Sequence, residues 1–225
     1  IALYLLIELG TLRQNTAALV SALRTQQLDQ ARLLLGQWMG RDSSAFSVTE
    51  VARSGIEKIL VTAYRNLFGV VLWFMLLGPA GALLYRLAEI LAHKWGGLND
   101  QEFGNFGHFA ARAFAWMEWL PARLTAISFA IVGDFEDAMY CWRSQAKQWM
   151  EEGLGIVLAS GAGAIGVKLG EALETGSGIE SRPEIGLGDD ADVDYMDSAI
   201  SLIWRTLMLW LVVLLLIALA RWTGA

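Results

Sequence analysis

The stretch MEWLPARLTAISFAIVGDFEDAMYCW, residues 117–142, decides the fold of this chain. Pro121 and Arg123 directly precede the apolar run 124–132, which ends in a small acidic turn. Charged and aromatic residues at the ends of an apolar run are typical of a helix that enters a membrane. Because proline cannot donate to the carbonyl four residues earlier, we expect a membrane helix over 110–132 that is kinked or begins anew at Pro121.

The composition of the whole chain agrees with a membrane protein. Of the 225 residues 55% are hydrophobic, 10 are Trp and 3 are Pro, and the mean hydropathy is +0.43. The net charge of −6 argues against a nucleic-acid partner,. One Cys excludes an internal disulfide, and two His make a His/Cys metal site unsupported,. The apolar residues 1–9 resemble the end of a helix, so we expect a membrane segment upstream of this sequence.

Hydrophobic spacing divides the rest of the chain into helical segments. The predicted segments are an amphipathic helical hairpin over 11–40, a broken membrane helix pair over 59–92, amphipathic and small-residue helices over 135–173, an acidic loop over 175–197 and a C-terminal transmembrane helix over 198–222. Ser47 and Glu50 match a capping box that starts a helix near residue 48. Gly78-Pro79 divides the pair, and 13 residues beyond it rise about 20 Å, too short to cross a bilayer. The predicted fold is a single all-α domain, a polytopic membrane bundle with a re-entrant or broken helix pair.

Two motifs resemble ligand-binding sequences, but the residues around them lack other features that those binding sites need. Residues 161–166 are a formal G-x-G-x-x-G, yet no second parallel strand follows, so a helix-packing face of small residues is the better interpretation,. Asp190, Asp192 and Asp194 resemble the start of a calcium loop that lacks its glycine and its final glutamate,. We therefore expect a solvated acidic loop and no metal site.

Six segments occur in the order of one protein family: LRTQQLDQARLLLGQWMGRDSS (23–44), EVARSGIEK (50–58), GPAGALLYR (78–86), EWLPARLTA (118–126), AGAIGVKLG (162–170) and RPEIGLG (182–188). Together they resemble the CobD/CbiB family of membrane proteins, whose founding members are adenosylcobinamide-phosphate synthases. Residues 118–142 look especially like its AmpE branch, an inner-membrane protein linked to β-lactamase regulation. The resemblance implies a multi-pass protein of the bacterial inner membrane.

Two synthase motifs are altered in this chain. Where the family's synthases have Glu-Asn-x-x-Asp-Gly after Glu57, this sequence has Val61, Thr62, Arg65 and Asn66, so both carboxylates are lost. Where the synthases have Asn-Thr-Leu-Asp, it has residues 89–92, Glu-Ile-Leu-Ala. These losses favour a protein without the synthase activity, because an ATP-dependent step with a metal-bound nucleotide needs oxygen ligands.

The resemblance implies a set of substrate-binding residues and leaves two functions open. The implied residues are Arg41, Asp42, Glu57, Arg86, Arg123 and Arg182, and no catalytic residue or metal ligand is assigned. Our first interpretation is an AmpE-like regulatory, scaffold or accessory subunit without a cofactor, which contacts the bilayer and either itself or another membrane protein complex. The alternative is a divergent adenosylcobinamide-phosphate synthase, which joins aminopropanol to a corrinoid carboxylate and uses ATP and Mg²⁺.

Overall fold

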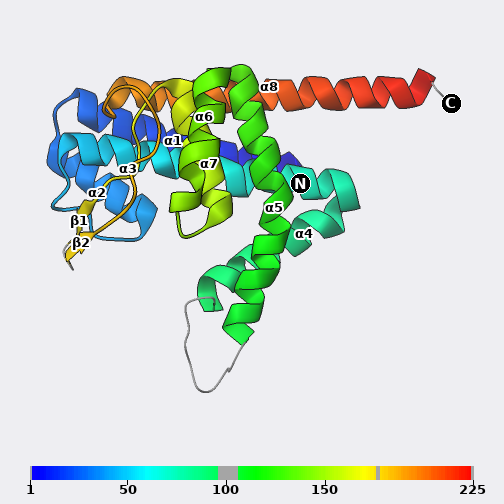
Figure 1. Ribbon diagram of the computed structural model, residues 1–225, viewed down its shortest axis with the longest axis horizontal. Coiled ribbons are helices and arrows are strands. Elements are labelled where there is room, and N and C mark those ends of the chain that lie inside the picture. The colour runs from blue at the N-terminus through cyan, green and yellow to red at the C-terminus, as the bar shows by residue number, and fades with distance from the viewer. Residues whose placement is uncertain (1, 96–105, 176–177, 224–225) are drawn as a thin grey trace.

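The computed structural model describes residues 2–95, 106–175 and 178–223. These residues form helices and one short hairpin of strands (Figure 1). In chain order the elements are α1 (Ala2–Arg24), α2 (Leu28–Met39), α3 (Val48–Ala63), the π-helical η1 (Tyr64–Gly69), α4 (Val70–Trp95), α5 (Phe106–Val132), α6 (Phe135–Gln145), the 3₁₀ turn η2 (Ala146–Gln148), α7 (Glu152–Ile165), β1 (Leu173–Thr175), β2 (Gly178–Glu180) and α8 (Val193–Thr223). The prediction of an all-α fold is confirmed, apart from the antiparallel β1–β2 pair.

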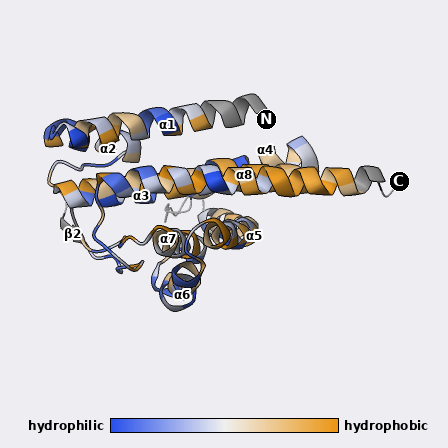
Figure 2. Ribbon diagram, turned by 90° about the horizontal axis from the view of Figure 1, so that it is seen from above, coloured by the Kyte–Doolittle hydropathy of each residue, from blue (hydrophilic) through white to orange (hydrophobic). Residues whose placement is uncertain are grey.

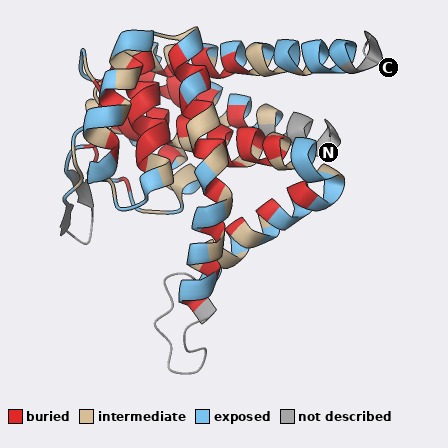
Figure 3. Ribbon diagram, turned by 45° about the vertical axis from the view of Figure 1, so that its right-hand side comes forward, coloured by how far each residue is buried: buried red, intermediate tan, exposed pale blue. Residues whose placement is uncertain are grey.

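Helix α3 lies at the centre of a helical body formed with α1, α2, α7 and the first half of α8. Ile56, Ile59 and Leu60 of α3 are fully buried, and Figure 3 shows buried residues concentrated in this body. Leu60 faces Gly161 of α7, where a Cβ would lie 2.9 Å from its methyl group. The body is therefore held by apolar side chains packed closely against glycine and alanine.

Local signals in the sequence set several helix ends. The Ser47 hydroxyl accepts from the Glu50 amide at 3.2 Å, and the Glu50 carboxylate accepts from the Ser47 amide at 2.7 Å, so the predicted capping box is confirmed. Asp192 accepts from the amides of Asp194 and Tyr195. This aspartate is therefore the cap of α8, which begins at Val193 and shortens the acidic loop predicted over 175–197,.

The predicted helix pair over 59–92 is broken where the sequence indicated. Gly78 has φ 68° and ψ −155°, which a residue with a side chain rarely adopts, and Pro79 follows it,. A second irregularity was not predicted: η1, a π-helical turn, joins α3 to α4. Gly69 of this turn lies against the Tyr85 ring, and a Cβ there would be 2.5 Å from it.

Helix α5 continues through Pro121, so of the two expected alternatives, a kink or a new helix start, the new start is wrong. Pro121 cannot donate to the carbonyl of Met117 four residues earlier. That carbonyl instead accepts from the indole N–H of Trp73 at 3.2 Å, and the adjacent carbonyl of Glu118 accepts from the Tyr64 hydroxyl at 3.3 Å. Side chains of α4 and η1 therefore compensate for the proline.

Two stretches of helix are long and apolar enough to cross a membrane, Val48–Trp95 and Val193–Ala220. Figure 2 shows the hydrophobic C-terminal half of α8, which projects from the helical body in Figure 1. Leu211, Leu215 and Leu219 in this half are each more than 40% exposed. Exposed leucines on a projecting helix are consistent with lipid contact.

The glycine motif at residues 161–166 lies in α7 and ends it, as the helix-packing interpretation requires. A Cβ on Gly163 would lie 2.5 Å from the carbonyl oxygen of Asp137 in α6. Gly166 adopts φ 70° as the C-cap of α7. The helices were predicted to reach residue 173, but α7 ends at Ile165, and Gly170 lies beyond it against Pro183.

Candidate functional site

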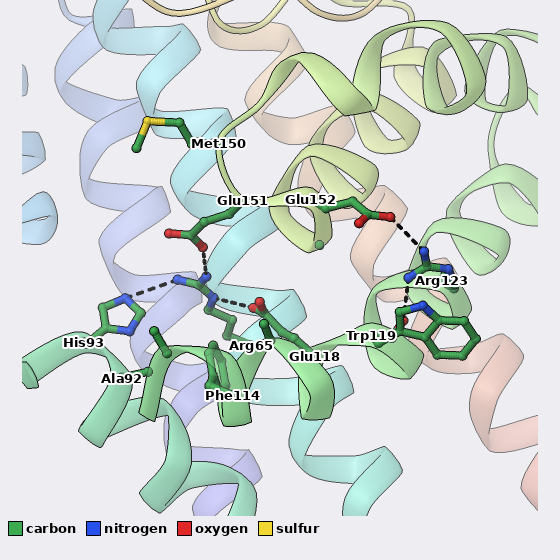
Figure 4. A pocket seen from close by; sticks show the side chains of 13 residues that line it. Arg65, Ala92, His93, Phe114, Glu118, Trp119, Arg123, Met150, Glu151 and Glu152 are labelled. Carbon is green, nitrogen blue, oxygen red and sulfur yellow. Dashed lines mark hydrogen bonds and ion pairs between the residues drawn. The ribbon is translucent and has the colours of Figure 1, made fainter. Parts of the chain in front are cut away.

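The guanidinium of Arg65 is the centre of a buried ionic network (Figure 4). Its Nε donates to Glu118 at 2.9 Å and its Nη2 to Glu151 at 2.6 Å. Its Nη1 donates to His93 Nε2 at 3.2 Å. Because a guanidinium has no acceptor, the His93 Nδ1 carries the ring proton, which it donates to the Glu89 carbonyl at 3.3 Å,. The network joins η1, α4, α5 and the turn before α7.

A pocket of about 620 Å³ opens beside this network. Arg65, His93 and Glu118 line one part of it, and Arg123 and Glu152 line another. Apolar side chains, among them Phe114 and Met150, form much of the remaining wall. The pocket thus presents guanidinium groups, carboxylates and apolar surface together, which suits a large ligand with both polar and apolar parts.

Arg123, one of the predicted site residues, lies in this pocket. Its Nη2 donates to Glu152 at 2.9 Å and its guanidinium stacks on the Trp119 ring, 4.3 Å from the centroid. Glu118 pairs with Arg65, which approaches it from another helix.

Arg86, the second predicted residue near the network, joins the two altered motifs. Its Nη1 donates to the Asn66 amide oxygen at 2.7 Å and to the Glu89 carboxylate at 2.5 Å. Asn66 and Glu89 both lie in the two motifs that the resemblance gives as altered. The replacements are therefore bonded to one another through Arg86, next to the Arg65 network.

Glu57 and Arg182 are brought together, although 125 positions separate them. The Arg182 Nη1 donates to Glu57 at 2.7 Å, and the other Glu57 oxygen accepts from the Gly170 amide at 2.8 Å. Both side chains are largely buried. A second pair, Arg53 with Glu171 at 2.5 Å, lies in the same connection between α3 and the segment after α7. These contacts fix that segment to α3.

Arg41 and Asp42 lie in the turn after α2, beside a separate pocket of about 370 Å³. Arg41 stacks over the Phe46 ring at 5.9 Å. The Ser44 amide donates to Asp42 at 3.0 Å and holds the pKa of this carboxyl below its usual value. The six predicted residues therefore do not converge on one pocket.

The residues that form the network were not predicted as a site. Arg65 was noted for its position in an altered motif, and His93 lies just beyond the helix pair predicted over 59–92. Helix α4 extends to Trp95, so His93 lies on a helix that faces Arg65. One sequence feature could have indicated the network. Position 65 is a cation and position 118 is a carboxylate, both lie within apolar helices, and such groups are normally paired.

Metal ligation is not supported by the side chains in this part of the chain. Among the described residues no group of three or more His, Cys, Asp or Glu side chains could hold a metal ion. The carboxylates of the pocket, Glu118, Glu151 and Glu152, each accept from an arginine. The donors present therefore do not fit a resident metal.

Fold and site define a helical protein with membrane-length apolar helices and a buried ionic site beside an amphipathic pocket. Comparison with known proteins identifies its family. The model of the CobD/CbiB protein family matches residues 1–203, so the chain belongs to the CobD/CbiB family.

Similar proteins from several bacteria carry the name cobalamin biosynthesis protein CobD. The protein of Stutzerimonas stutzeri (strain A1501) is 35% identical over 96% of this chain and 71% of its own length. That of Chromobacterium violaceum is 36% identical over 92% of this chain and 66% of its own length. That of Mycobacterium tuberculosis (strain CDC 1551 / Oshkosh) is 27% identical over 86% of this chain and 63% of its own length. No solved structure matches the chain.

Proposed function

We propose that the chain acts in cobalamin biosynthesis, as a divergent synthase that joins an aminopropanol group to a corrinoid carboxylate. The similarity that carries this proposal extends over 92–96% of the chain to two proteins named cobalamin biosynthesis protein CobD. These relatives favour the synthase over the AmpE-like regulatory role that the sequence first suggested. The proposed location is the bacterial inner membrane, with the exposed C-terminal half of α8 and the apolar part of the Val48–Trp95 stretch in the bilayer.

The pocket supports this proposal by its chemistry. Arginine forms paired hydrogen bonds with carboxylates and phosphates, and Arg65 and Arg123 both line the pocket,. The apolar wall would receive the ring system of a large substrate, while the arginines orient its acidic groups. An opening of about 620 Å³ would take only part of a corrinoid, so the substrate would be held at its edge.

In this proposal the residues of the chain bind and orient the reactants. Arg123 stacks on Trp119 and would contact the carboxylate of the substrate after exchange with Glu152, which is 66% exposed. His93 lines the pocket, and its Nε2 would be able to take a proton from an amine only after release from the Arg65 N–H,. ATP would supply the activation, and we assign no step to a metal because the donors present do not fit one.

A second candidate is an accessory or regulatory subunit that binds another copy of itself or a membrane protein complex. The observation that favours it is that side chains of the altered motifs form ion pairs and hydrogen bonds with other residues of the protein. Arg65 pairs with Glu118 and Glu151, and Asn66 and Glu89 bond to Arg86. Groups already satisfied by the protein have less need of a substrate.

Genetic complementation separates the two candidates. The full-length protein would be expressed in a bacterium that lacks its own synthase and needs cobalamin for growth. The proposal predicts growth on a cobalamin precursor, and loss of growth for Arg123→Met but not for Arg32→Met, an arginine paired with Asp29. Absence of growth, with the protein present in the membrane and a family synthase active in the same strain, would support the accessory role.

A further inference from the structure

A groove of about 660 Å³ lies between α1 and the first half of α8. Its lining side chains come from residues 13–25 on one side and from residues 197–204 on the other. The two helices are antiparallel in Figure 1, and the Arg24 guanidinium at the end of α1 donates to Asp194 at 3.5 Å and to Asp197 at 2.7 Å near the start of α8. This α1–α8 groove shares no lining residue with the pocket of the buried ionic network.

One end of the α1–α8 groove lies where α8 begins to expose apolar side chains. Trp204, which lines the groove, is 43% exposed, and Met208, Leu211 and Leu215 beyond it are each more than half exposed. Tryptophan is enriched at the boundary between membrane and water, and an exposed apolar helix beyond it suits the lipid interior. The ion pair of Arg24 is exposed at the opposite end. The groove therefore leads from water to the edge of the apolar part of α8.

Arg13 lies at the apolar end of the α1–α8 groove. It precedes Arg24 by eleven residues, about 16 Å along α1, whereas Trp204 follows Asp197 by seven residues, about 10 Å along α8,. Because the helices are antiparallel, Arg13 is level with Trp204 or beyond it. Arg13 is exposed, and within the part of the chain that the structure describes its side chain forms no hydrogen bond or ion pair. A guanidinium at the edge of the lipid is costly unless an anion pairs with it.

We propose that the α1–α8 groove binds the headgroup of an anionic glycerophospholipid, whose phosphate pairs with Arg13. A guanidinium donates paired hydrogen bonds to phosphate oxygens and stays charged at physiological pH. The charged groups that line the groove are Arg13, Arg24 and Asp197, which together carry a net charge of +1, and Arg24 already pairs with Asp197. The uncompensated charge is therefore that of Arg13, and one negative headgroup balances it.

The walls of the groove suit a lipid that extends in both directions from its phosphate. Ala17 and Val20 lie four and seven residues after Arg13, on the same face of α1,. Ser21, beside Val20, adds an exposed hydroxyl. The alcohol of the headgroup would lie on this face, towards Ser21, and the acyl chains would follow the exposed apolar side of α8 beyond Trp204. A lipid thus uses both the groove and the apolar surface next to it.

Native mass spectrometry of the full-length protein in detergent, with phosphatidylglycerol added in steps, tests the site. We expect one phosphatidylglycerol to bind before any others, and Arg13→Met to weaken that binding at least about tenfold, because a charge-assisted pair is lost. Phosphatidylcholine with the same acyl chains should bind more weakly than phosphatidylglycerol. Arg143→Met is the matched control and should bind the lipid as the wild type does, since Arg143 is an exposed arginine of α6 that does not line the groove.

Ala17→Phe separates loss of the groove from loss of the charge. Ala17 is exposed, so the protein should fold with a phenylalanine there, which fills the groove and leaves Arg13 in place. We expect weaker phosphatidylglycerol binding in this variant, with a melting temperature near that of the wild type. Phosphatidylglycerol binding that is unchanged in Arg13→Met or in Ala17→Phe would overturn the proposal.

Other occupants of the α1–α8 groove give different results. Stabilisation by inorganic phosphate that depends on Arg13, without any retained lipid, would assign the site to a free anion. A dimer that Arg13→Met dissociates would assign the groove to a second copy of the chain, and either result contradicts a lipid site. The outcome is independent of complementation, because no residue of the groove lines the pocket of the proposed synthase.

Discussion

Arg65 and Glu118 form a buried ion pair, with 2.9 Å between Nε and Oε1, across 53 positions of sequence. Arg65 lies in a π-helical turn, and Glu118 lies in the middle of α5. The ring of Phe114, four residues before Glu118, has its centroid 5.7 Å from the Arg65 guanidinium. π-Helical turns often occur at functional sites. The pair fixes α5 against η1 and forms part of the pocket wall.

Removing one partner of this pair should destabilise the protein strongly. Glu118→Leu leaves Arg65 partly uncompensated and should lower the free energy of unfolding by about 3 kcal/mol. The double variant Arg65→Met/Glu118→Leu should recover most of that loss, because no buried charge remains. Glu152→Leu is the control: its pair with Arg123 is solvent-accessible and should contribute less than about 1 kcal/mol,. Thermal unfolding in detergent compares the three variants with the wild type, and equal losses for Glu118→Leu and Glu152→Leu would contradict the assignment.

The Glu57–Arg182 pair should hold the segment between α7 and α8 against α3. Glu57→Gln weakens the contact with Arg182 and the bond from the Gly170 amide. We expect faster cleavage between residues 166 and 192 in limited proteolysis, followed by mass spectrometry. Glu184→Gln removes an exposed pair at 3.8 Å and should leave the cleavage rate unchanged. Identical digestion of both variants would show that the buried pair does not retain the segment.

Gly163 should not tolerate a methyl group. In Gly163→Ala the new Cβ would meet the Asp137 carbonyl, so α6 and α7 must separate at a cost of about 1–3 kcal/mol,. Gly10→Ala provides the matched control, because Gly10 lies in α1 with no atom within 4 Å of its Cβ position. Alanine there should stabilise the helix by about 0.5–1 kcal/mol. A melting temperature for Gly163→Ala equal to that of the wild type would refute the close approach of α6 and α7.

The thiol of Cys141 should be almost inert at pH 8. Burial, with a smaller contribution from Asp137, raises its pKa to about 11. Because the thiolate is the reactive form, alkylation by iodoacetamide should be roughly 100-fold slower in the folded protein than in the protein unfolded in detergent. Raising the pH towards 11 should accelerate it. Intact-mass measurement gives the rate, and rapid alkylation of the native protein at pH 8 would show that Cys141 is accessible.

The sequence predicted the helices better than the contacts between them. Helical spacing, the Ser47–Glu50 capping box and Gly78-Pro79 are local signals, and the structure follows them closely. The continuity of α5 through Pro121 depends on Trp73, which is distant in sequence and donates to the Met117 carbonyl.

The sequence named some of the residues of the candidate site but not their partners. Glu57, Arg182, Arg86 and Arg123 all lie in buried or pocket-lining ionic contacts. The substrate-binding role that the family resemblance implied for them stays a prediction. The partnership of Arg65 with Glu118 depends on the packing of α5 against η1, which no local pattern encodes.

The most direct test of the proposed function is the product formed by membranes that contain the full-length protein. These membranes would be incubated with a corrinoid carboxylate, ATP and an aminopropanol donor, and the products identified by mass spectrometry. The account predicts a corrinoid amide, formed with the loss of one water relative to acid and amine, and much less of it with Arg123→Met. No amide above the level of empty membranes, while a family synthase in the same preparation forms it, would contradict the account.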